Sequence, residues 1–319
     1  MNKALKVFAG SALGVGAATA GLCELIYQGV LNIPLHRKIM GTGIFNNPEE
    51  QKLWDENEIL LAGRKWFDEL APKDTMLQSR LGHDIFCNII PAEKETHNWA
   101  VVIHGYGDCP RGMSHYAWKY HTLGCNVLLP HMIGHDSDPE KYCSMGARDH
   151  ILVVDWINEI VRRDPQAVIV LHGVSMGSAT TMLVTGDPLP ENVVAAVADC
   201  GYTSCWDEYA SQIGAIFHLP VFPFLDMINF ISKNVHHNFD FKECSPLEAV
   251  KRSKTPTFFV HGEADTFVPY TMMEPLYNAC AAEKDKLSVP GAFHAVSAFI
   301  DNDLYWDRIL AFLQKYITF

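Results

Sequence analysis

The stretch Ala167-Val168-Ile169-Val170-Leu171-His172-Gly173-Val174-Ser175-Met176-Gly177 decides the fold of this chain. Its five leading apolar residues predict a buried strand. The G-x-S-x-G spacing that follows is typical of a nucleophile elbow, a tight strand-to-helix turn in which small residues two positions before and two positions after the serine let the chain pass close to its neighbours. Such a turn raises the hydroxyl of Ser175 above the sheet. It also points the backbone N–H of Met176, at the start of the next helix, toward any oxyanion formed there.

A serine hydroxyl needs a base within hydrogen-bond reach before it can act as a nucleophile near neutral pH. Two later residues follow strand-like runs: Asp265 comes after residues 257–261, and His294 after residues 287–289. The chain order serine, acid, histidine is the order that accompanies a nucleophile elbow. We expect His294 to take the serine proton and Asp265 to orient its ring and stabilise the imidazolium. Asp199, after another strand-like run, is the alternative acid.

A second oxyanion donor is expected from the loop after an early strand. Residues 100–103 form an apolar run, and His104-Gly105-Tyr106-Gly107 follows it directly. We assign the second donor to the backbone N–H of Tyr106.

These motifs make the chain resemble an α/β-hydrolase of the serine-esterase type over about residues 75–319. The motifs that carry the resemblance are HGYG at 104–107, GVSMG at 173–177, DCGYTS at 199–204, HGEADTFVP at 261–269 and GAFHA at 291–295. The chain is similar in particular to a bacterial subgroup of membrane-anchored or exported hydrolases. The resemblance implies an α/β fold with a mostly parallel central sheet, helices on both faces and a helical cap insertion. It also implies a serine hydrolase, esterase- or lipase-like, that needs no cofactor.

One loop departs from that pattern. His131-Met132-Ile133-Gly134-His135-Asp136 stands where relatives usually carry Asp-x-Arg-Gly-His-Gly, so the ion pair of that loop is not expected here. His131 and His135 are spaced like a pair of metal ligands on a helix. Pro130 and Gly134 favour a loop instead, and no metal site is predicted.

The rest of the chain alternates between strand and helix patterns, which predicts parallel strands with helices on both faces. A hairpin is expected over 75–81 and 84–90, strands over 126–129 and 193–198, and helices over 148–163 and 301–316. Residues 32–74 are expected to hold a connector and one helix that runs from Asn47-Pro48-Glu49-Glu50 to about Leu70.

Residues 202–241 interrupt this alternation inside the hydrolase domain of 75–319. They are rich in large apolar side chains and contain no strand pattern. We expect them to form the cap and to shape a pocket for an apolar acyl or aryl group. The alternative is that these helices simply pack on the core.

Residues 1–31 have a different composition. Lys3 and Lys6 precede an uncharged stretch over 7–23, which predicts a membrane anchor. A signal peptide cleaved after Ala18-Thr19-Ala20 is one alternative, and a soluble amphipathic helix is another. We expect a catalytic domain outside the cytoplasm, either anchored in the cell membrane or secreted if residues 1–20 are removed.

The composition of the chain excludes some classes of function. A net charge of −12 over 319 residues excludes a nucleic-acid partner, because phosphate binding needs clustered Lys and Arg. The nine cysteines show no zinc-type pairing. The expected activity is the cleavage of small carboxylic esters through an acyl-enzyme. Two alternatives stay open: a serine peptidase of the prolyl-oligopeptidase type, and a membrane-tethered, non-catalytic binding protein on the same scaffold.

Overall fold

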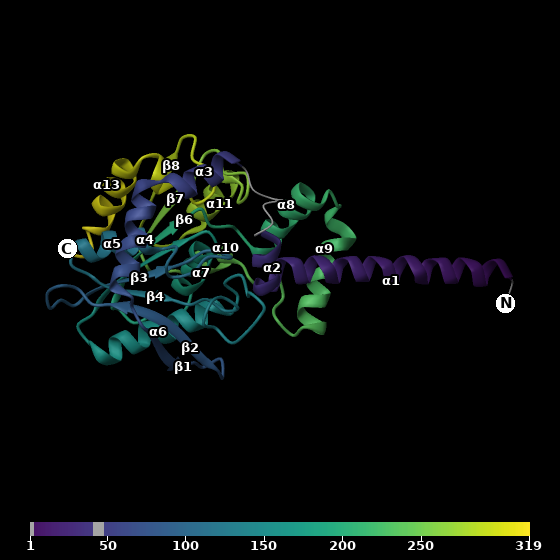
Figure 1. The fold of residues 1–319 in the computed structure, drawn as a ribbon, viewed down its shortest axis with the longest axis horizontal. Helices are drawn as coiled ribbons and strands as arrows, with labels where there is room; N and C mark the ends of the chain where they lie inside the picture. The colour runs from purple at the N-terminus through teal and green to yellow at the C-terminus, as the bar shows by residue number, and fades with distance from the viewer. Residues whose placement is uncertain (1–2, 41–47) are drawn as a thin grey trace.

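A twisted eight-stranded sheet forms the centre of the protein (Figure 1). The computed structural model describes residues 3–40 and 48–319. The strands are β1 (Asp74–Gln78), β2 (Asp84–Ile90), β3 (Asn98–Ile103), β4 (Asn126–Pro130), β5 (Val168–Val174), β6 (Val193–Asp199), β7 (Thr257–Gly262) and β8 (Lys284–Val289). They lie in the spatial order β1-β2-β4-β3-β5-β6-β7-β8.

The first two strands are antiparallel and the others run parallel to one another. β1 pairs with β2 as the expected hairpin, and β2 pairs antiparallel with β4. From β4 to β8 every neighbouring pair is parallel. The carboxyl ends of these strands therefore meet at one edge of the sheet, where ligands bind in open α/β sheets. The α/β-hydrolase fold expected from the sequence is confirmed.

Helices cover both faces of the sheet. One face packs on α5 (Ser114–Thr122) and α13 (Asn302–Leu313), with α4 (Glu58–Leu70) outside α5. The short helix α12 (Ser297–Ile300) precedes α13. The other face packs on α6 (Asp149–Arg163), α7 (Met176–Thr185), α10 (Pro246–Val250) and α11 (Met273–Ala279). The strands between them are buried on both faces, which explains their continuous apolar sequences.

The single helix expected over residues 47–70 is wrong, because the segment contains two helices. α3 (Pro48–Glu56) ends before Asn57, and α4 begins after it. The backbone of Asn57 is extended, and its side chain accepts hydrogen bonds from the N–H groups of Ile59 and Leu60. An asparagine that caps a new helix in this way interrupts the preceding one. Asn47, the expected start of the single helix, lies outside the described residues.

The cap consists of α8 (Cys205–Phe217), α9 (Val221–Phe230) and a π-helical turn (Ile231–Val235). The long helix α1 (Lys3–Leu31) lies beside α9 and leads into α2 (Ile33–Met40), as Figure 1 shows. The last turns of α1 belong to the core, because Cys23, Tyr27 and Leu31 are almost completely buried. Tyr27 also stacks on His236 with ring centroids 4.5 Å apart.

The amino-terminal half of α1 extends away from the body (Figure 1). Within residues 3–40 and 48–319, no helix is by itself both long and apolar enough to cross a bilayer. Among the described helices, one bent pair, α8 together with Val221–Val235, reaches that length and composition, and the bend between its two parts is 119°.

Candidate active site

Ser175 occupies the turn between β5 and α7 in a backbone conformation that side chains rarely adopt, with φ 58° and ψ −120°. Neighbouring backbone leaves no space for a side chain at the glycines two residues before and two residues after the serine. A Cβ at Gly173 would lie 2.1 Å from the carbonyl oxygen of Gly177, and a Cβ at Gly177 would lie 2.1 Å from that of Ile103. The two glycines of the motif are thus required by the close approach of α7 to β5 and β3.

A hydrogen-bonded chain of side chains runs from the serine into the protein. His294 Nε2 lies 2.8 Å from Ser175 Oγ, and His294 Nδ1 lies 2.8 Å from Asp265 Oδ2. Asp265 Oδ1 accepts the backbone N–H groups of Phe267 and Val268, each at 3.0 Å. The structure therefore brings together Ser175, His294 and Asp265, which lie far apart in the sequence.

The carboxyl of Asp265 is held in its ionised form. Burial alone would raise its pKa, but His294 beside it and hydrogen bonds from His261 and His294 outweigh burial and lower the pKa below its ordinary value. His261 Nε2 lies 3.3 Å from Asp265 Oδ2 and 3.0 Å from the carbonyl oxygen of Val268. A fixed negative charge at this position orients the neighbouring imidazole through its Nδ1.

Asp199, the alternative acid, lies behind the elbow and has a different set of partners. Its backbone carbonyl accepts the N–H of Ser175 at 2.9 Å, and its Oδ2 accepts the hydroxyl of Tyr305 at 2.8 Å. Tyr305 in turn contacts His172 at 3.0 Å. Burial raises the pKa of Asp199 to about 6 against the hydrogen bond from Tyr305. Asp265, not Asp199, makes the hydrogen bond to His294.

The loop after β3 lies directly against the serine. A Cβ at Gly105 would lie 3.3 Å from Ser175 Cβ. No hydrogen bond joins the backbone N–H of Tyr106 or of Met176 to another group within residues 3–40 and 48–319. Both donors expected for an oxyanion therefore remain available for a substrate oxygen.

Two histidines that are not among the predicted site residues support this loop. His135 Nε2 accepts the N–H of Gly107 at 3.0 Å, and His104 Nε2 accepts the N–H of Met132 at 3.2 Å. Burial lowers the pKa of each of these histidines to about 3, so both rings are neutral acceptors at pH 7. Two neutral histidines thus join the loop after β3 to residues 131–136, the loop in which relatives were expected to use an ion pair. Asp136 instead pairs with Arg37 of α2 at 3.0 Å.

A cavity of about 410 Å³ opens beside Ser175 and His294. The described residues around it come from α2, α3, α4, α5 and the loops that carry the serine, the histidine and the expected oxyanion donor. They are His36, Arg37, Trp54, Arg64, Gly105, Tyr106, Gly107, Asp108, Gly112, Met113, His115, Tyr116, Val174, Ser175, His294 and Ala295. None of them belongs to residues 202–241, which were expected to shape the pocket. The cap contacts the site from the acid side, where Gln212 donates to the carbonyl of Phe267.

One group of potential metal ligands lies at the site. Ligand atoms of Cys200, Asp265 and His294 lie within 4.8 Å of one another. Burial raises the pKa of the Cys200 thiol well above its ordinary value, so the sulfur is held as a neutral thiol. Both ring nitrogens of His294 already face protein oxygens. This donor set fits proton transfer better than metal binding.

Comparison with known proteins places the chain among hydrolases. The sequence pattern of the prolyl oligopeptidase family matches residues 140–318. The uncharacterized protein YqkD of Bacillus subtilis is 26% identical over 255 residues, which are 78% of this chain and 81% of that protein. The α/β-hydrolase domain-containing protein WAV2 of Arabidopsis thaliana is 24% identical over 207 residues, which are 61% of this chain and 62% of WAV2.

Solved structures share the fold at low sequence identity. The Pyrococcus furiosus esterase Pf2001 superimposes with a TM-score of 0.63 and 18% identity, over 78% of this chain and 95% of the esterase. The acylaminoacyl peptidase of Pyrococcus horikoshii superimposes with a TM-score of 0.57 and 20% identity, over 77% of this chain and 42% of the peptidase. With the family match, which spans more than half of the chain, these findings show that the chain belongs to the prolyl oligopeptidase family, among the serine hydrolases of the α/β-hydrolase superfamily.

Proposed function

We propose that this serine hydrolase cleaves carboxylic esters with Ser175 as nucleophile, His294 as base and Asp265 as the acid that orients the histidine. The observation that carries the proposal is the pair of 2.8 Å contacts that link Ser175 Oγ to His294 and His294 to Asp265. These contacts lie at the wall of a 410 Å³ cavity, which is large enough for a small ester.

The reaction follows from this arrangement. His294 Nε2 takes the hydroxyl proton while Ser175 Oγ bonds to the ester carbonyl carbon, and Asp265 stabilises the imidazolium that forms. The N–H groups of Tyr106 and Met176 bind the oxyanion. The carbon–oxygen bond to the alcohol then breaks, and the alcohol leaves with the proton from His294. Water then attacks the acyl carbon and gives a proton to His294. The bond from the acyl carbon to Ser175 Oγ breaks, and His294 returns the proton to Oγ as the acid leaves.

Two observations favour esters. Much of the cavity wall is apolar or aromatic, with Trp54, Met113, Tyr116 and Val174 among its residues, and such a wall suits acyl and aryl groups. In addition, the esterase of Pyrococcus furiosus is matched over 95% of its chain, whereas the acylaminoacyl peptidase of Pyrococcus horikoshii is matched over 42%.

A peptidase is the second candidate, because the matching family is that of prolyl oligopeptidase. The same Ser175, His294 and Asp265 would serve amide cleavage, since both reactions pass through a tetrahedral oxyanion. The alternatives differ only in the leaving group, which is an amine in one case and an alcohol in the other.

The experiment measures hydrolysis of 4-nitrophenyl acyl esters of increasing chain length beside a set of peptide 4-nitroanilides. Ser175→Ala is expected to abolish both turnover and labelling by a fluorophosphonate. Ser178→Ala is the control, because this buried serine of α7 forms no hydrogen bond with its side chain among the described residues. Turnover of nitroanilides without esters would establish the peptidase instead. If the folded protein neither turns over nor labels, it is a binding protein on this scaffold.

The N-terminal helix and the cap support a proposal about location. Leu22 and Leu25 of α1 are 41% and 70% exposed, and Phe222 and Phe230 of α9 are 77% and 56% exposed. We propose that this apolar surface and the N-terminal part of α1 hold the protein at the outer face of the cell membrane. Flotation of the full chain with liposomes is expected, and Leu25→Glu with Phe222→Glu should weaken it. Equal flotation of the variant would contradict this role for the surface.

A further inference from the structure

The cavity beside Ser175 contains two guanidinium groups in a protein whose net charge is −12. Arg37 comes from α2 and Arg64 from α4. The acidic surface of the whole protein repels small anions, so a local positive group at the reacting serine changes which substrates can approach it. The partners of the two arginines decide which of them is free to bind a substrate.

Arg37 is already engaged. Its guanidinium donates to Asp136 Oδ1 at 3.0 Å and to the carbonyl oxygen of Asp108 at 3.1 Å. These contacts join α2 to the two loops beneath it. Arg37 therefore serves mainly to hold the wall of the cavity.

Arg64 has no comparable partner. Its Nε is buried without a hydrogen bond, and its guanidinium forms no ion pair within residues 3–40 and 48–319. A buried N–H donor without an acceptor destabilises a protein, so this side chain is not held in place by the usual hydrogen bonds of a structural arginine. Arg64 Nε thus has no acceptor among the described residues.

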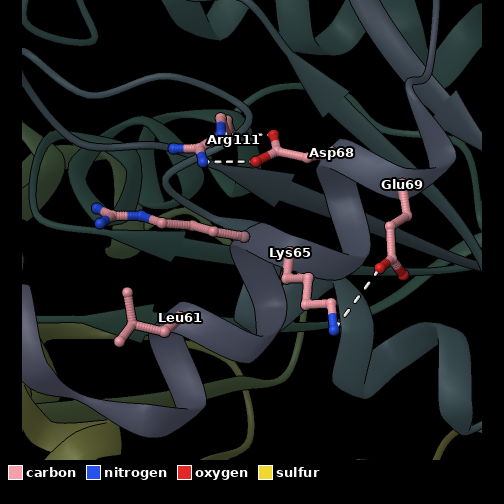
Figure 2. Close-up of a pocket in the computed structure, with 6 residues that line it drawn as sticks. Leu61, Lys65, Asp68, Glu69 and Arg111 are labelled. Atoms are coloured by element: carbon pink, nitrogen blue, oxygen red, sulfur yellow. Dashed lines mark hydrogen bonds and ion pairs between the residues drawn. The ribbon is translucent and has the colours of Figure 1, made fainter.

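The two neighbouring cations, Lys65 of α4 and Arg111 of the loop before α5, each lie beside a carboxylate, as Figure 2 shows. In a shallow surface pocket that shares Arg64, Arg111 makes two hydrogen bonds of 2.7 and 2.6 Å to Asp68, and Lys65 lies 3.8 Å from Glu69. Arg111 and Lys65, the other two cations of this surface pocket, therefore each have a carboxylate partner. Arg64 makes no direct ion pair within the described residues, although the charges of Asp68 and Asp108 act on it, and it is the one of these three cations that also lines the cavity of Ser175.

The other titratable groups around the cavity leave this positive charge in place. Burial lowers the pKa of His36, and it lowers that of His115 to about 3, so both rings are neutral at pH 7. Burial raises the pKa of Asp108 to about 6, with Cys109 N–H, Arg64 and Arg37 acting against this and Asp136 acting with it. Asp108 forms no ion pair with Arg64 in the described structure, and it places a competing negative charge in the same cavity.

We propose that Arg64 binds a carboxylate of the substrate, so that the preferred esters of this enzyme are anionic. This inference rests on the proposed esterase function and adds the substrate class. The planar guanidinium can hold a carboxylate through two parallel N–H···O bonds, while the aromatic rings of Trp54 and Tyr116 line the same cavity. Substrates that fit are monoesters of dicarboxylic acids and aryl esters whose ring carries a carboxylate.

Two pairs of esters test the proposal. One pair compares the mono-4-nitrophenyl ester of glutaric acid with 4-nitrophenyl pentanoate, which has a neutral chain of equal length. The other compares the acetyl esters of 3-carboxy-4-nitrophenol and 4-nitrophenol, which differ by a carboxylate on the leaving group. The charged ester of at least one pair is expected to have a kcat/KM about tenfold higher.

Variants distinguish direct binding of the carboxylate by Arg64 from a general effect of positive charge near the cavity. Arg64→Gln is expected to lower the ratio of kcat/KM for the charged ester to kcat/KM for the neutral ester about tenfold, and Arg64→Lys should retain part of the preference. Lys65→Gln is the matched control, because it removes one positive charge from the adjacent residue, which lines only the surface pocket. It should leave the preference intact. Thermal unfolding checks that the variants fold.

A binding measurement keeps the test independent of turnover. Calorimetry of Ser175→Ala with phenylacetate and with neutral phenylacetamide should show binding of the carboxylate, weakened about tenfold by Arg64→Gln. No preference for either charged ester, no carboxylate binding, or equal losses in Arg64→Gln and Lys65→Gln would overturn the role of Arg64. Serine-dependent hydrolysis of neutral esters without a preference for the charged ones would support the esterase proposal and overturn the role of Arg64. Carboxylate binding that depends on Arg64, without hydrolysis of any ester, would support binding by Arg64 and overturn the esterase proposal.

Discussion

The hydroxyl of Tyr106 donates a hydrogen bond to the backbone carbonyl of Val30, in the last turn of α1. The ring of Tyr106 also meets His36 of α2 edge-on, with centroids 4.6 Å apart. Because the backbone N–H of Tyr106 is one proposed oxyanion donor, the N-terminal helices support the part of the site that must be most rigid during catalysis.

Tyr106→Phe tests this relationship. The variant keeps the ring and the backbone donor but loses the anchor to Val30, so the donor moves more freely in the transition state. We expect kcat for a 4-nitrophenyl ester to fall about three- to tenfold with little change in KM, and the free energy of unfolding to fall by about 1 kcal/mol.

Tyr142→Phe is the matched control. The Tyr142 hydroxyl contacts Gln28 of α1 at 2.9 Å, and it takes no part in the loop after β3. A similar loss of stability with unchanged kcat is expected. Equal kcat values for Tyr106→Phe and Tyr142→Phe would show that α1 supports the fold and not the oxyanion loop.

Truncation of α1 should distinguish its two halves. A chain that starts at Gly16 retains Cys23, Tyr27 and Leu31, which are almost completely buried, and is expected to unfold at the same urea concentration as the full chain. A chain that starts at Ile33 loses these side chains and the contact with Tyr106. We expect its free energy of unfolding to be lower by several kcal/mol, together with loss of esterase activity. Full activity of the shorter chain would refute a structural role for the end of α1.

Sequence motifs were informative where function depends on short segments at the ends of strands. Ser175, Asp265 and His294 each follow a strand of the parallel part of the sheet, and parallel strands bring their carboxyl ends to one edge. The meeting of the three residues could therefore be expected without knowledge of side-chain packing. The two glycines around Ser175 added a local reason, since both are required by close backbone contacts.

The cavity wall was not foreseen, because it depends on contacts distant in sequence. Arg64 lies on a helix whose sequence shows only an amphipathic pattern, and nothing in that pattern tells which face reaches the serine. The packing of α1 against the body of the protein was not foreseen either. An apolar helix that packs on protein has the composition of one that enters lipid, so composition did not reveal that Tyr27 belongs to the core.

Replacement of the acid distinguishes the two aspartates near the serine. Asp265→Asn removes the charge that stabilises the protonated histidine and is expected to lower kcat by a factor of about 10³–10⁴ for an ester substrate. Asp199→Asn changes a residue that bonds to Tyr305 and not to His294, so a much smaller effect is expected. Single-turnover and steady-state rates at pH 7 measure both. A larger loss in Asp199→Asn would reverse the assignment.

The cap contains a buried carboxyl whose proton affinity should make stability depend on pH. Glu208 of α8 is 3% exposed, and its Oε1 accepts the side-chain amide of Gln212 at 3.0 Å. Its Oε2 has no hydrogen-bond partner within the described part of the chain. Burial raises the pKa of Glu208 from 4.5 to about 8, against the hydrogen bond from Gln212 and with the help of the negative charge of Asp265.

The Glu208 carboxyl should make the protein less stable as pH rises. Between about pH 4.5 and pH 8 the folded protein holds a proton on Glu208 that the unfolded chain has released, so the free energy of unfolding falls as pH rises through this window. The stabilisation is complete below pH 4.5 and is lost above pH 8. Glu208→Gln cannot ionise and should lack this contribution to the slope. Urea unfolding at pH 5 and pH 8.5 is expected to show a loss of a few kcal/mol in the wild type that the variant does not share. Glu243→Gln, at an exposed glutamate next to the cap, is the control. If Glu208→Gln and Glu243→Gln both keep the wild-type slope, the Glu208 carboxyl ionises as readily in the folded protein as in the unfolded chain.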